Sequence, residues 1–421
     1  MDREAGEKVV FGEPGQITAL INARLIDGRG GEPVEGAVVR IRDGDIVGVG
    51  REPVQASEVS VDCNGMTLLP GLIDAHAHLI YTDFRSLDAV DRCSIETSSI
   101  NAVNNARKVL DAGYTTIRDV GTVGNVAVAM RDAVADGKVA GPRIIASGQI
   151  IFPTGGLGET LPPHWTSDHG LGRRVDSPDA MRAEVRRQIR HGVDNIKLAA
   201  SGVEVGPYAW TWMTTFSEEE IAVAVEEAHR WGRTVAVHAQ SYDSVRFSLN
   251  AGVDTIEHGT RIDAETAKAF AQSDTVLVPT LSTLFSVIEL GSKLNLMPKQ
   301  REEMKVNEPL WIESMLRCRD EGVPIASGAD LGNRYPHGAN AREIELLSRV
   351  GLSPMEALLA ATAVAAKALK LDHEVGTIEE GKRADLLLFN GDPLTDIASL
   401  QDAARIALVV KAGLPAAGFR A

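Results

Sequence analysis

The chain has 421 residues and a formal net charge of −15, from 43 lysines and arginines against 58 aspartates and glutamates. This negative balance argues against a nucleic-acid partner, because phosphate binding needs a basic face. The hydrophobic fraction of 44% is typical of a globular protein. The sequence contains no run of 18 apolar residues without a charge, so we expect no membrane-spanning helix.

The N-terminal segment and the cysteines predict the compartment. Residues 1–16 contain neither the apolar core nor the cleavage site of a secretory signal. Cys63, Cys93 and Cys318 are odd in number, widely spaced and form no CxxC pair, which indicates free thiols in a reducing environment. We therefore expect a cytoplasmic protein.

Both ends of the chain have the pattern of β-structure. Short β-rich runs, separated by Gly-Gly and Asp-Gly turn signals, occupy residues 17–25, 36–42, 45–50, 59–69, 376–391 and 406–413. Because these runs flank a different middle, we expect residues 1–68 and 371–421 to build one small β-sandwich domain together.

The middle of the chain, residues 69–370, alternates apolar strands with amphipathic helical patterns. Eight strand candidates lie at residues 71–78, 115–121, 143–148, 195–201, 234–239, 255–259, 276–281 and 324–330. One helical stretch, residues 217–232, opens with the capping box of Ser217 and Glu220. Apolar strands that alternate with helices imply a parallel sheet buried on both faces, and eight such units predict an α/β fold, the (β/α)8 TIM barrel.

Metal-ligating residues follow the predicted strands at their carboxyl ends, where such barrels hold their active sites. His76 and His78 end the first strand, and side chains two apart on a strand point to one face. His238 ends the fifth strand, His258 the sixth, and Asp330 follows the eighth. A single histidine at a strand end is more often structural, but five ligands at four strand ends together predict a site for zinc or a similar divalent metal.

Lys197 lies on the fourth strand, within the run NIKLAAS. An ammonium group has three donors and no acceptor, so it cannot ligate a cation. Two interpretations remain at this point. Lys197 either points elsewhere as half of an ion pair, or its nitrogen reacts with CO₂ to form a carbamate whose two oxygens bridge two metals about 3.5–4 Å apart.

The order HxH, Lys, His, His, Asp, with GLIDAHAHL early and SGAD late, resembles the amidohydrolase superfamily. The runs TTIRDVG, TGG, IKLAASG, FSEEEI, VHA and IEHG are similar to its branch of metal-dependent prolidases, carboxypeptidase-like enzymes and xenobiotic amide hydrolases. The resemblance covers nearly the whole chain, including EEGKRADLLLFNGDPL near its end.

This resemblance implies a centre of two divalent metals, with zinc expected. It implies that His76 and His78 bind the more buried ion, that His238 and His258 bind the other, and that carboxylated Lys197 bridges them. Asp330 would ligate the buried ion and carry a proton from a metal-bridging hydroxide to the leaving nitrogen. Tyr208, after the fourth strand, is the candidate donor to the oxyanion; a surface-loop tyrosine is the alternative.

Two loops indicate the substrate. Leu157 follows the TGG run, where many peptidase members place a histidine, and three of five tryptophans lie in two short loops. The candidate substrate-binding residues are Leu157, His164, Trp165, His169, Trp210 and Trp212. An apolar rim offers little to a free carboxylate, so we expect an amide, carbamate or urea with an aromatic or bulky group. A C-terminal peptide bond is also kept as the bond that the enzyme cleaves.

Other functions stay open from the sequence. An Xaa-Pro dipeptidase or carboxypeptidase, a mononuclear deaminase or cyclic-amide hydrolase, and a non-catalytic scaffold on the same fold are the alternatives. Lys197 argues against the mononuclear class, whose members typically lack it, and the complete ligand set argues against the scaffold. We expect a small-molecule substrate, no nucleic acid, no membrane, and a homo-oligomer.

Overall fold

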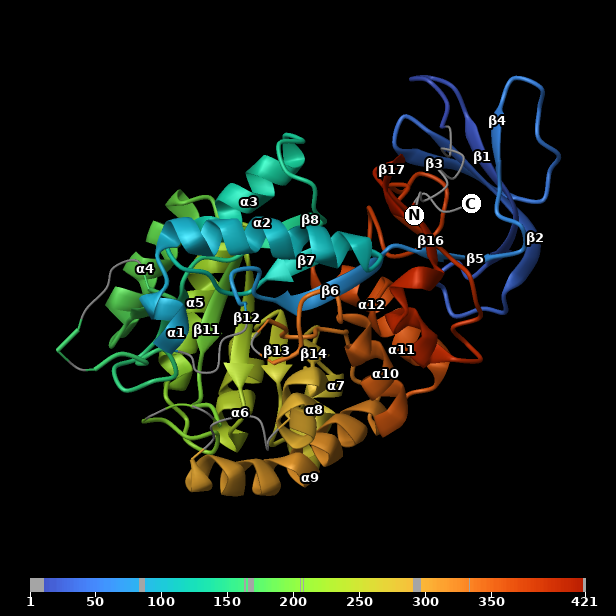
Figure 1. Ribbon diagram of the computed structural model, residues 1–421. Coiled ribbons are helices and arrows are strands. Elements are labelled where there is room, and N and C mark those ends of the chain that lie inside the picture. The colour runs from blue at the N-terminus through green and yellow to red at the C-terminus, as the bar shows by residue number, and fades with distance from the viewer. Residues whose placement is uncertain are drawn as a thin grey trace.

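The computed structural model describes residues 11–82, 88–162, 164–165, 170–204, 206, 208–290, 297–332 and 334–418. A ring of parallel strands surrounded by helices lies beside a separate sheet, to which both ends of the chain return (Figure 1).

The first and last parts of the chain share one sheet. Its strands are β1 (Thr18–Leu25), β2 (Val34–Arg42), β3 (Asp45–Gly50), β4 (Val59–Asp62), β5 (Thr67–Pro70), β15 (Leu386–Phe389), β16 (Ile406–Lys411) and β17 (Leu414–Gly418). Strand β5 joins the two parts, because it pairs with β1 on one side and with β15 on the other. The expected β-sandwich is therefore one continuous hydrogen-bonded sheet in the described residues, and β5 crosses the expected boundary between residues 68 and 69.

The parallel strands follow one another around the ring. They are β6 (Leu72–Ala77), β7 (Tyr114–Asp119), β8 (Arg143–Ala146), β11 (Asn195–Ala199), β12 (Thr234–Ala239), β13 (Thr255–His258) and β14 (Val276–Val278). Isolated bridges join Ser147 to Asn195 and Leu277 to Ile325, and the Ala75 amide donates to the Ser327 carbonyl at 2.9 Å. These contacts connect eight segments in the order expected of a (β/α)8 barrel. The eighth, residues 324–330, contributes one isolated bridge and single hydrogen bonds in place of a regular strand.

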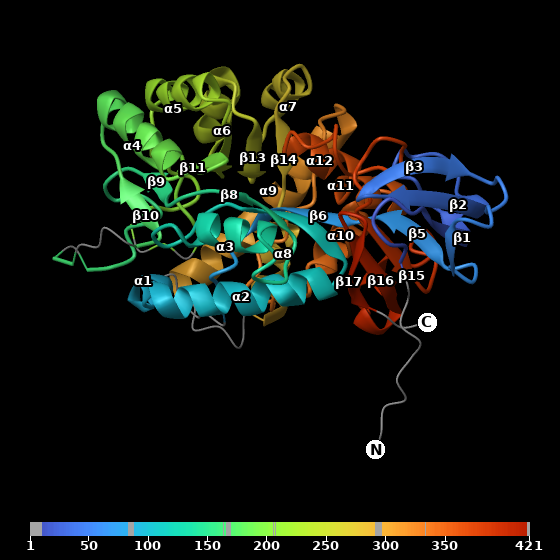
Figure 2. The same ribbon diagram turned by 90° about the horizontal axis from the view of Figure 1, so that it is seen from above.

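Helices cover the outside of the ring (Figure 2). They are α1 (Asp88–Arg92), α2 (Ile95–Asp111), α3 (Val126–Ala135), α4 (Pro178–Arg190), α5 (Glu218–Arg230), α6 (Tyr242–Ala251), α7 (Ala264–Ala271), α8 (Leu281–Leu290), α9 (Pro298–Asp320), α10 (Ala341–Val350), α11 (Pro354–Ala360) and α12 (Ala363–Ala368), with 3-10 turns η1 (Ile397–Gln401) and η2 (Ala403–Arg405) near the end. The expected capping box begins α5: the Glu220 amide donates to Ser217 Oγ at 3.3 Å and the Ser217 amide to Glu220 Oε2 at 2.9 Å.

Two further strands have no counterpart in the sequence-based prediction. β9 (Ile150–Phe152) and β10 (Gly172–Arg174) pair with each other between β8 and α4, and β9 also contacts β11 through Ile151 and Leu198. They extend the sheet of the ring toward the loop that holds Leu157 and Trp165.

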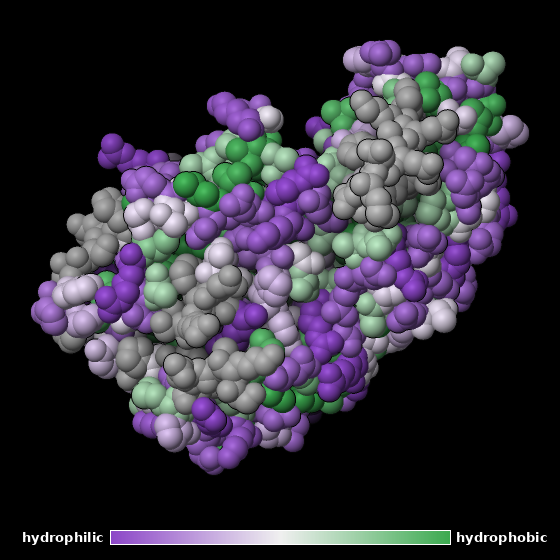
Figure 3. Space-filling model, viewed as in Figure 1, coloured by the Kyte–Doolittle hydropathy of each residue, from purple (hydrophilic) through white to green (hydrophobic). Residues whose placement is uncertain are grey.

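The structure also describes the helices, the surface and the three cysteines that the sequence analysis considered. No helix of the described residues is long and apolar enough to cross a membrane, and hydrophilic residues dominate the face seen in Figure 3, where hydrophobic residues form small patches. Cys63, Cys93 and Cys318 are all free, as expected.

Candidate metal centre

All six expected ligands meet at one cavity. His76, Lys197, His238 and His258 lie on β6, β11, β12 and β13, His78 directly follows β6, and Asp330 is the last residue of the eighth segment. The carboxyl ends of parallel strands share one edge of the ring, and the six side chains line a cavity of about 70 Å³ there.

The distances suit a cluster around small cations. Nε2 of His76 and Nε2 of His78 lie 3.8 and 3.7 Å from Asp330 Oδ1. The ring centroids of His238 and His258 are 4.4 Å apart. Ligand atoms of His76, His258 and Asp330 all lie within 4.8 Å of one another, so these three could hold one ion directly.

Hydrogen bonds orient the first two imidazoles. Nδ1 of His76 lies 2.7 Å from Glu257 Oε2, and Nδ1 of His78 lies 2.8 Å from the Gly121 carbonyl oxygen. A neutral imidazole that donates from Nδ1 carries its lone pair on Nε2. Both rings therefore present an acceptor nitrogen toward Asp330.

The other two imidazoles are held in the same manner. Thr280 Oγ1 donates to the Pro279 carbonyl at 2.8 Å and thus accepts from Nδ1 of His258, 2.6 Å away, so the lone pair of His258 lies on Nε2. His238 Nε2 lies 2.9 Å from the Gly202 carbonyl, which leaves Nδ1 as its acceptor. Burial is the largest cause that lowers the pKa of His238 to about 3, which keeps the ring in the neutral form that binds metals.

Lys197 bears on the two earlier interpretations. The residue is only 2% exposed, and among the described residues Nζ has no hydrogen-bond partner, which gives no support to an ion pair. Burial lowers the pKa of the ammonium to about 8, although the charge of Glu257 opposes the shift. An orphaned amine among metal ligands fits a group that is completed by modification, because leaving it unsatisfied costs free energy.

Asp330 combines a perturbed acidity with a strained backbone. Burial raises the pKa of its carboxyl to about 7, while Thr283 Oγ1 donates to Oδ2 at 2.9 Å. Asp330 has φ of 47° and His258 has φ of 71°, a region that non-glycine residues rarely adopt. Such strain persists only where surrounding contacts hold it, and it gathers at functional sites.

The contacts that hold Asp330 come from the first strand. Oδ1 of Asp74 accepts from the amides of His76 and Ala329, each at 3.0 Å, so one carboxylate ties both sides of the centre together. Gly328 is needed beside them, because a Cβ there would lie 2.7 Å from Cβ of His76 and 2.4 Å from a Val278 methyl group.

The expected aromatic rim is placed elsewhere. Tyr208 and Trp212 are 48% and 58% exposed, and Trp210 is buried with Lys299 Nζ 4.0 Å from its ring centroid. The loop is drawn to α9, since Thr211 shares hydrogen bonds with Asn307 at 3.1–3.3 Å. These three side chains are not among the described residues that line the metal cavity. The role of Tyr208 as a donor to the oxyanion therefore stays a prediction.

Of the other expected substrate-binding residues, Leu157 lines the metal cavity. The His164 ring lies edge-on to that of Trp165, which is half exposed with Arg92 over it. Neither residue is among the described residues that line the metal cavity. His169 lies outside the described residues. The tertiary path of these loops, not their aromatic content, decides which side chains line the candidate metal cavity.

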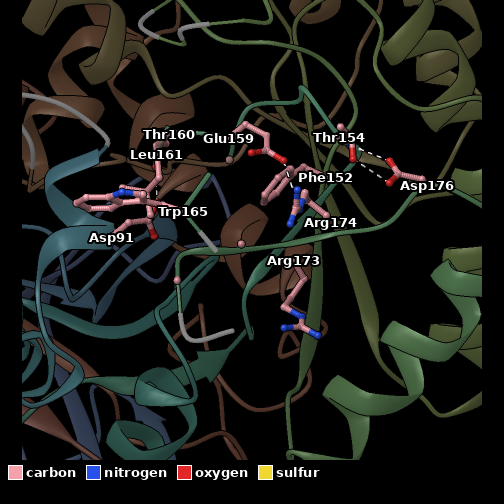
Figure 4. A pocket seen from close by; sticks show the side chains of 13 residues that line it. Asp91, Phe152, Thr154, Glu159, Thr160, Leu161, Trp165, Arg173, Arg174 and Asp176 are labelled. Carbon is pink, nitrogen blue, oxygen red and sulfur yellow. Dashed lines mark hydrogen bonds and ion pairs between the residues drawn. The ribbon is translucent and has the colours of Figure 1, made fainter. Parts of the chain in front are cut away.

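Trp165 borders a second hollow, drawn in Figure 4, of about 420 Å³. Some of its charged groups have partners there. Arg174 Nε lies 3.4 Å from Glu159 Oε1, and Asp176 accepts from the Thr154 amide and hydroxyl at 2.7 and 2.8 Å. Among the described residues, no cluster of candidate metal ligands lies at this hollow.

Sequence reasoning missed several members of the metal cavity: Tyr81, Ile150, Ala199, Val203, Glu204, Gln240, Thr283 and Arg334. It also missed Glu257, which orients His76, and Thr280, which orients His258. Glu257 had a local signal, because it directly precedes His258 on an apolar strand where a carboxylate is unexpected. Arg334 had none, since its loop position does not indicate which way the side chain turns.

The whole chain is similar to a known protein family and to several solved structures. A model described as "Amidohydrolase family" matches residues 67–415. Ochratoxinase of Aspergillus niger is 28% identical over 428 residues, which cover 94% of this chain and 86% of that protein. The solved structure of a prolidase complexed with N-methylphosphonate-L-proline has 30% identity and a TM-score of 0.88, over 95% of this chain and 99% of that one. A Xaa-Pro dipeptidase with bound methionine in its active site has 30% identity, a TM-score of 0.86 and the same coverage.

Proposed function

This chain belongs to the amidohydrolase family, and from that premise we propose a two-metal hydrolase that cleaves an amide-type C–N bond. One observation carries the proposal: four neutral histidines, Asp330 and the orphaned Lys197 gather in one buried cavity. Relatives that are a prolidase and a Xaa-Pro dipeptidase, both 30% identical over nearly the whole chain, support the choice of a C–N bond.

The ligand set divides naturally between two ions. His76 and His78 with Asp330 would hold one ion, and His238 with His258 would hold the other. Lys197, once it carries CO₂ as a carbamate, would supply an anionic oxygen to each, which answers its lack of a partner. These nitrogen and oxygen donors suit zinc, which is the expected ion. Bound ions of this kind lower the pKa of water and polarise a carbonyl group.

Within that frame the protein's own task is proton transfer. Water adds its oxygen to the acyl carbon, the C–N bond breaks, and the water proton moves through Asp330 to the leaving nitrogen, which departs as an amine. An acid with a pKa near the working pH is suited to accept and return a proton. Burial by itself raises the pKa of the Asp330 carboxyl to about 7. Bound cations would lower this pKa, because they favour the charged carboxylate. Thr283 holds the carboxyl in place from Oδ2.

Metal content and hydrolysis together test this proposal. Purified protein should bind two divalent ions per chain, lose hydrolysis after chelation, and regain it on addition of Zn²⁺ or Mn²⁺. The substrate panel should span N-acyl amino acids, short peptides, aryl amides, carbamates and phenylureas. Full activity in metal-stripped protein would refute the mechanism.

A mononuclear centre is the second candidate, because ligand atoms of His76, His258 and Asp330 lie within 4.8 Å of one another among the described residues, close enough to hold one ion. In that case the enzyme would be a deaminase or cyclic-amide hydrolase, and Lys197 would be dispensable for metal binding. A stoichiometry of one ion per chain, unchanged in Lys197→Ala, would favour this candidate.

A further inference from the structure

Helix α8 begins beside the metal centre, and its start is held by a side chain from another helix. Oε1 of Glu343, in the first turn of α10, accepts from the Leu281 amide at 2.8 Å. Oε2 accepts from the amide and the hydroxyl of Ser282 at 2.6 and 2.7 Å. The first amides of a helix have no partner within the helix, and Thr280, the residue before α8, uses its hydroxyl elsewhere. Glu343, 62 residues further along the chain than Leu281, therefore caps α8.

The residues on either side of this cap hold two of the candidate metal ligands. Oγ1 of Thr280 accepts from Nδ1 of His258 at 2.6 Å, and Oγ1 of Thr283 donates to Oδ2 of Asp330 at 2.9 Å. Thr280 has φ of 50°, a region that β-branched residues rarely adopt, and the Thr283 amide donates to its carbonyl at 3.0 Å. Residues 280–283 thus form one turn. Its two outer hydroxyls bind the ligands, and its two middle residues are bound to the carboxyl group from α10.

The first turn of α8 depends on both oxygens of Glu343. The residue is fully buried, so water does not replace a lost hydrogen bond. Burial raises the pKa of the carboxyl to about 8, while the hydrogen bonds from Ser282 and Leu281 oppose this shift. With or without its proton, a carboxyl group has two oxygens that accept. A glutamine side chain has one, and its NH₂ group would face a backbone N–H group, so the turn would have to move.

The same turn of α10 is tied to the first strand of the ring. Nδ2 of Asn340 donates to Oδ2 of Asp74 at 2.6 Å, and the Glu343 amide donates to the Asn340 carbonyl at 3.1 Å. The other oxygen of Asp74 accepts from the amides of His76 and Ala329. Because Asn340 ties the start of α10 to the sheet, Glu343 holds α8 from a fixed position.

We propose that Glu343 is a positioning residue of the metal centre. By holding the turn of residues 280–283, it sets where the two threonine hydroxyls lie, and through them it orients His258 and the Asp330 carboxyl. Glu343 itself is not among the described residues that line the metal cavity, so its effect passes through the turn. The inference rests on the proposed hydrolase function for its effect on the rate, whereas its effect on metal binding needs no turnover.

The test is a double-mutant cycle between Glu343 and Thr283. Glu343→Gln weakens the cap, and Thr283→Val removes the hydroxyl that binds Asp330 while it keeps the shape of the side chain. Each change should lower kcat on the best substrate of the panel about 10- to 100-fold, the effect of a lost partner of a metal ligand, with KM within about threefold. Thr283→Val added to Glu343→Gln should cost less than about threefold more, because the hydroxyl is already misplaced. Independent effects would multiply.

Zinc binding gives a readout without turnover. In competition with a chelator, the affinity of Glu343→Gln for Zn²⁺ should be about 10- to 100-fold lower than that of the wild type, and Thr283→Val should again add little to it. Glu343→Asp keeps two accepting oxygens and should lie between the wild type and Glu343→Gln in both kcat and affinity.

Two further variants control for stability. Asp263→Asn weakens the cap of α7, where Asp263 accepts from the Thr266 amide at 2.8 Å, and should lower the melting temperature while kcat and Zn²⁺ affinity stay unchanged. Ser282→Ala removes only the hydroxyl bond to Glu343. It takes the place of Glu343→Gln in the cycle if that variant does not fold, with an expected loss of about 2- to 10-fold.

The outcomes separate the two proposals. Losses that fail to multiply, in kcat or in Zn²⁺ affinity, support the role of Glu343. Losses that multiply, or a Glu343→Gln variant that changes only the melting temperature, overturn this role and leave the hydrolase function standing. If metal-loaded wild-type protein cleaves no compound of the panel, the hydrolase proposal fails and the cycle in Zn²⁺ affinity alone decides the role of Glu343. A wild-type protein that binds no Zn²⁺ would overturn both.

Discussion

Arg118→Met should destabilise the protein strongly through Glu257 and so disturb His76. The Arg118 and Glu257 side chains are fully buried, with 2.8 Å between the guanidinium nitrogen and Oε1. The other carboxylate oxygen lies 2.7 Å from Nδ1 of His76. Loss of the guanidinium leaves a buried carboxylate beside a neutral imidazole, and the Ala75 carbonyl loses a donor.

The size of the effect follows from this burial. Removing one partner of a buried pair costs about 3–5 kcal/mol, because the remaining charge stays desolvated. Arg246→Met makes the same change at an exposed pair, where Asp243 lies 2.8 Å away on the surface of α6, and should cost about 0–1 kcal/mol. The double variant Arg118→Met/Glu257→Gln removes the stranded charge and should recover at least about 1 kcal/mol relative to Arg118→Met.

Urea unfolding followed by tryptophan fluorescence measures these differences, provided that the m-value is unchanged between variants. The measurement should be made on metal-loaded and metal-stripped protein, since a reoriented His76 also weakens metal binding, by about 10- to 100-fold for lost partners of this kind. If Arg118→Met is as stable as Arg246→Met, or if the double variant is no more stable than Arg118→Met, the argument from a stranded charge is wrong.

Three further changes test other parts of the site and the fold. Lys197→Ala should lose the second metal and most activity, and a short carboxylic acid should restore part of both; wild-type metal content and rate would refute the carbamate. Asp330→Asn should lower kcat about 10²- to 10⁴-fold in folded protein, and a loss below tenfold would remove the proton-transfer role. His229 donates to Asp254 at 2.8 Å, which raises the pKa of the imidazole. Because the pKa of His229 is higher in the folded protein than in the unfolded chain, its contribution to stability is complete below the unfolded pKa, near 6.5, and is lost as the pH rises through the folded pKa. The urea midpoint of the wild-type protein should therefore fall between pH 6 and 8, and His229→Gln should make this fall smaller. An unchanged pH profile would contradict this.

The ligands of the candidate metal centre could be predicted from sequence because their signals are local. The HxH spacing of His76 and His78 has the period of a strand, and a strand of parallel sheet that ends in a histidine places it at a known edge. The same holds for His238 and His258. The hydrophobic pattern therefore predicted both the order of the elements and the side of the ring on which these side chains meet.

The partners of those ligands needed the tertiary structure. Glu257 reaches His76 and Arg118 across the ring, and Arg118 precedes Glu257 by 139 residues, so no local pattern joins them. The other residues that line the metal cavity also depend on contacts between distant parts of the chain. Contacts with α9 turn Trp210 away from the cavity, while the loop after the eighth segment places Arg334 in its lining. Strand periodicity is a property of a few neighbouring residues, and it determined which potential ligands face the candidate metal cavity. The path of a loop depends on surfaces that meet only after folding, and it decided which other side chains line that cavity.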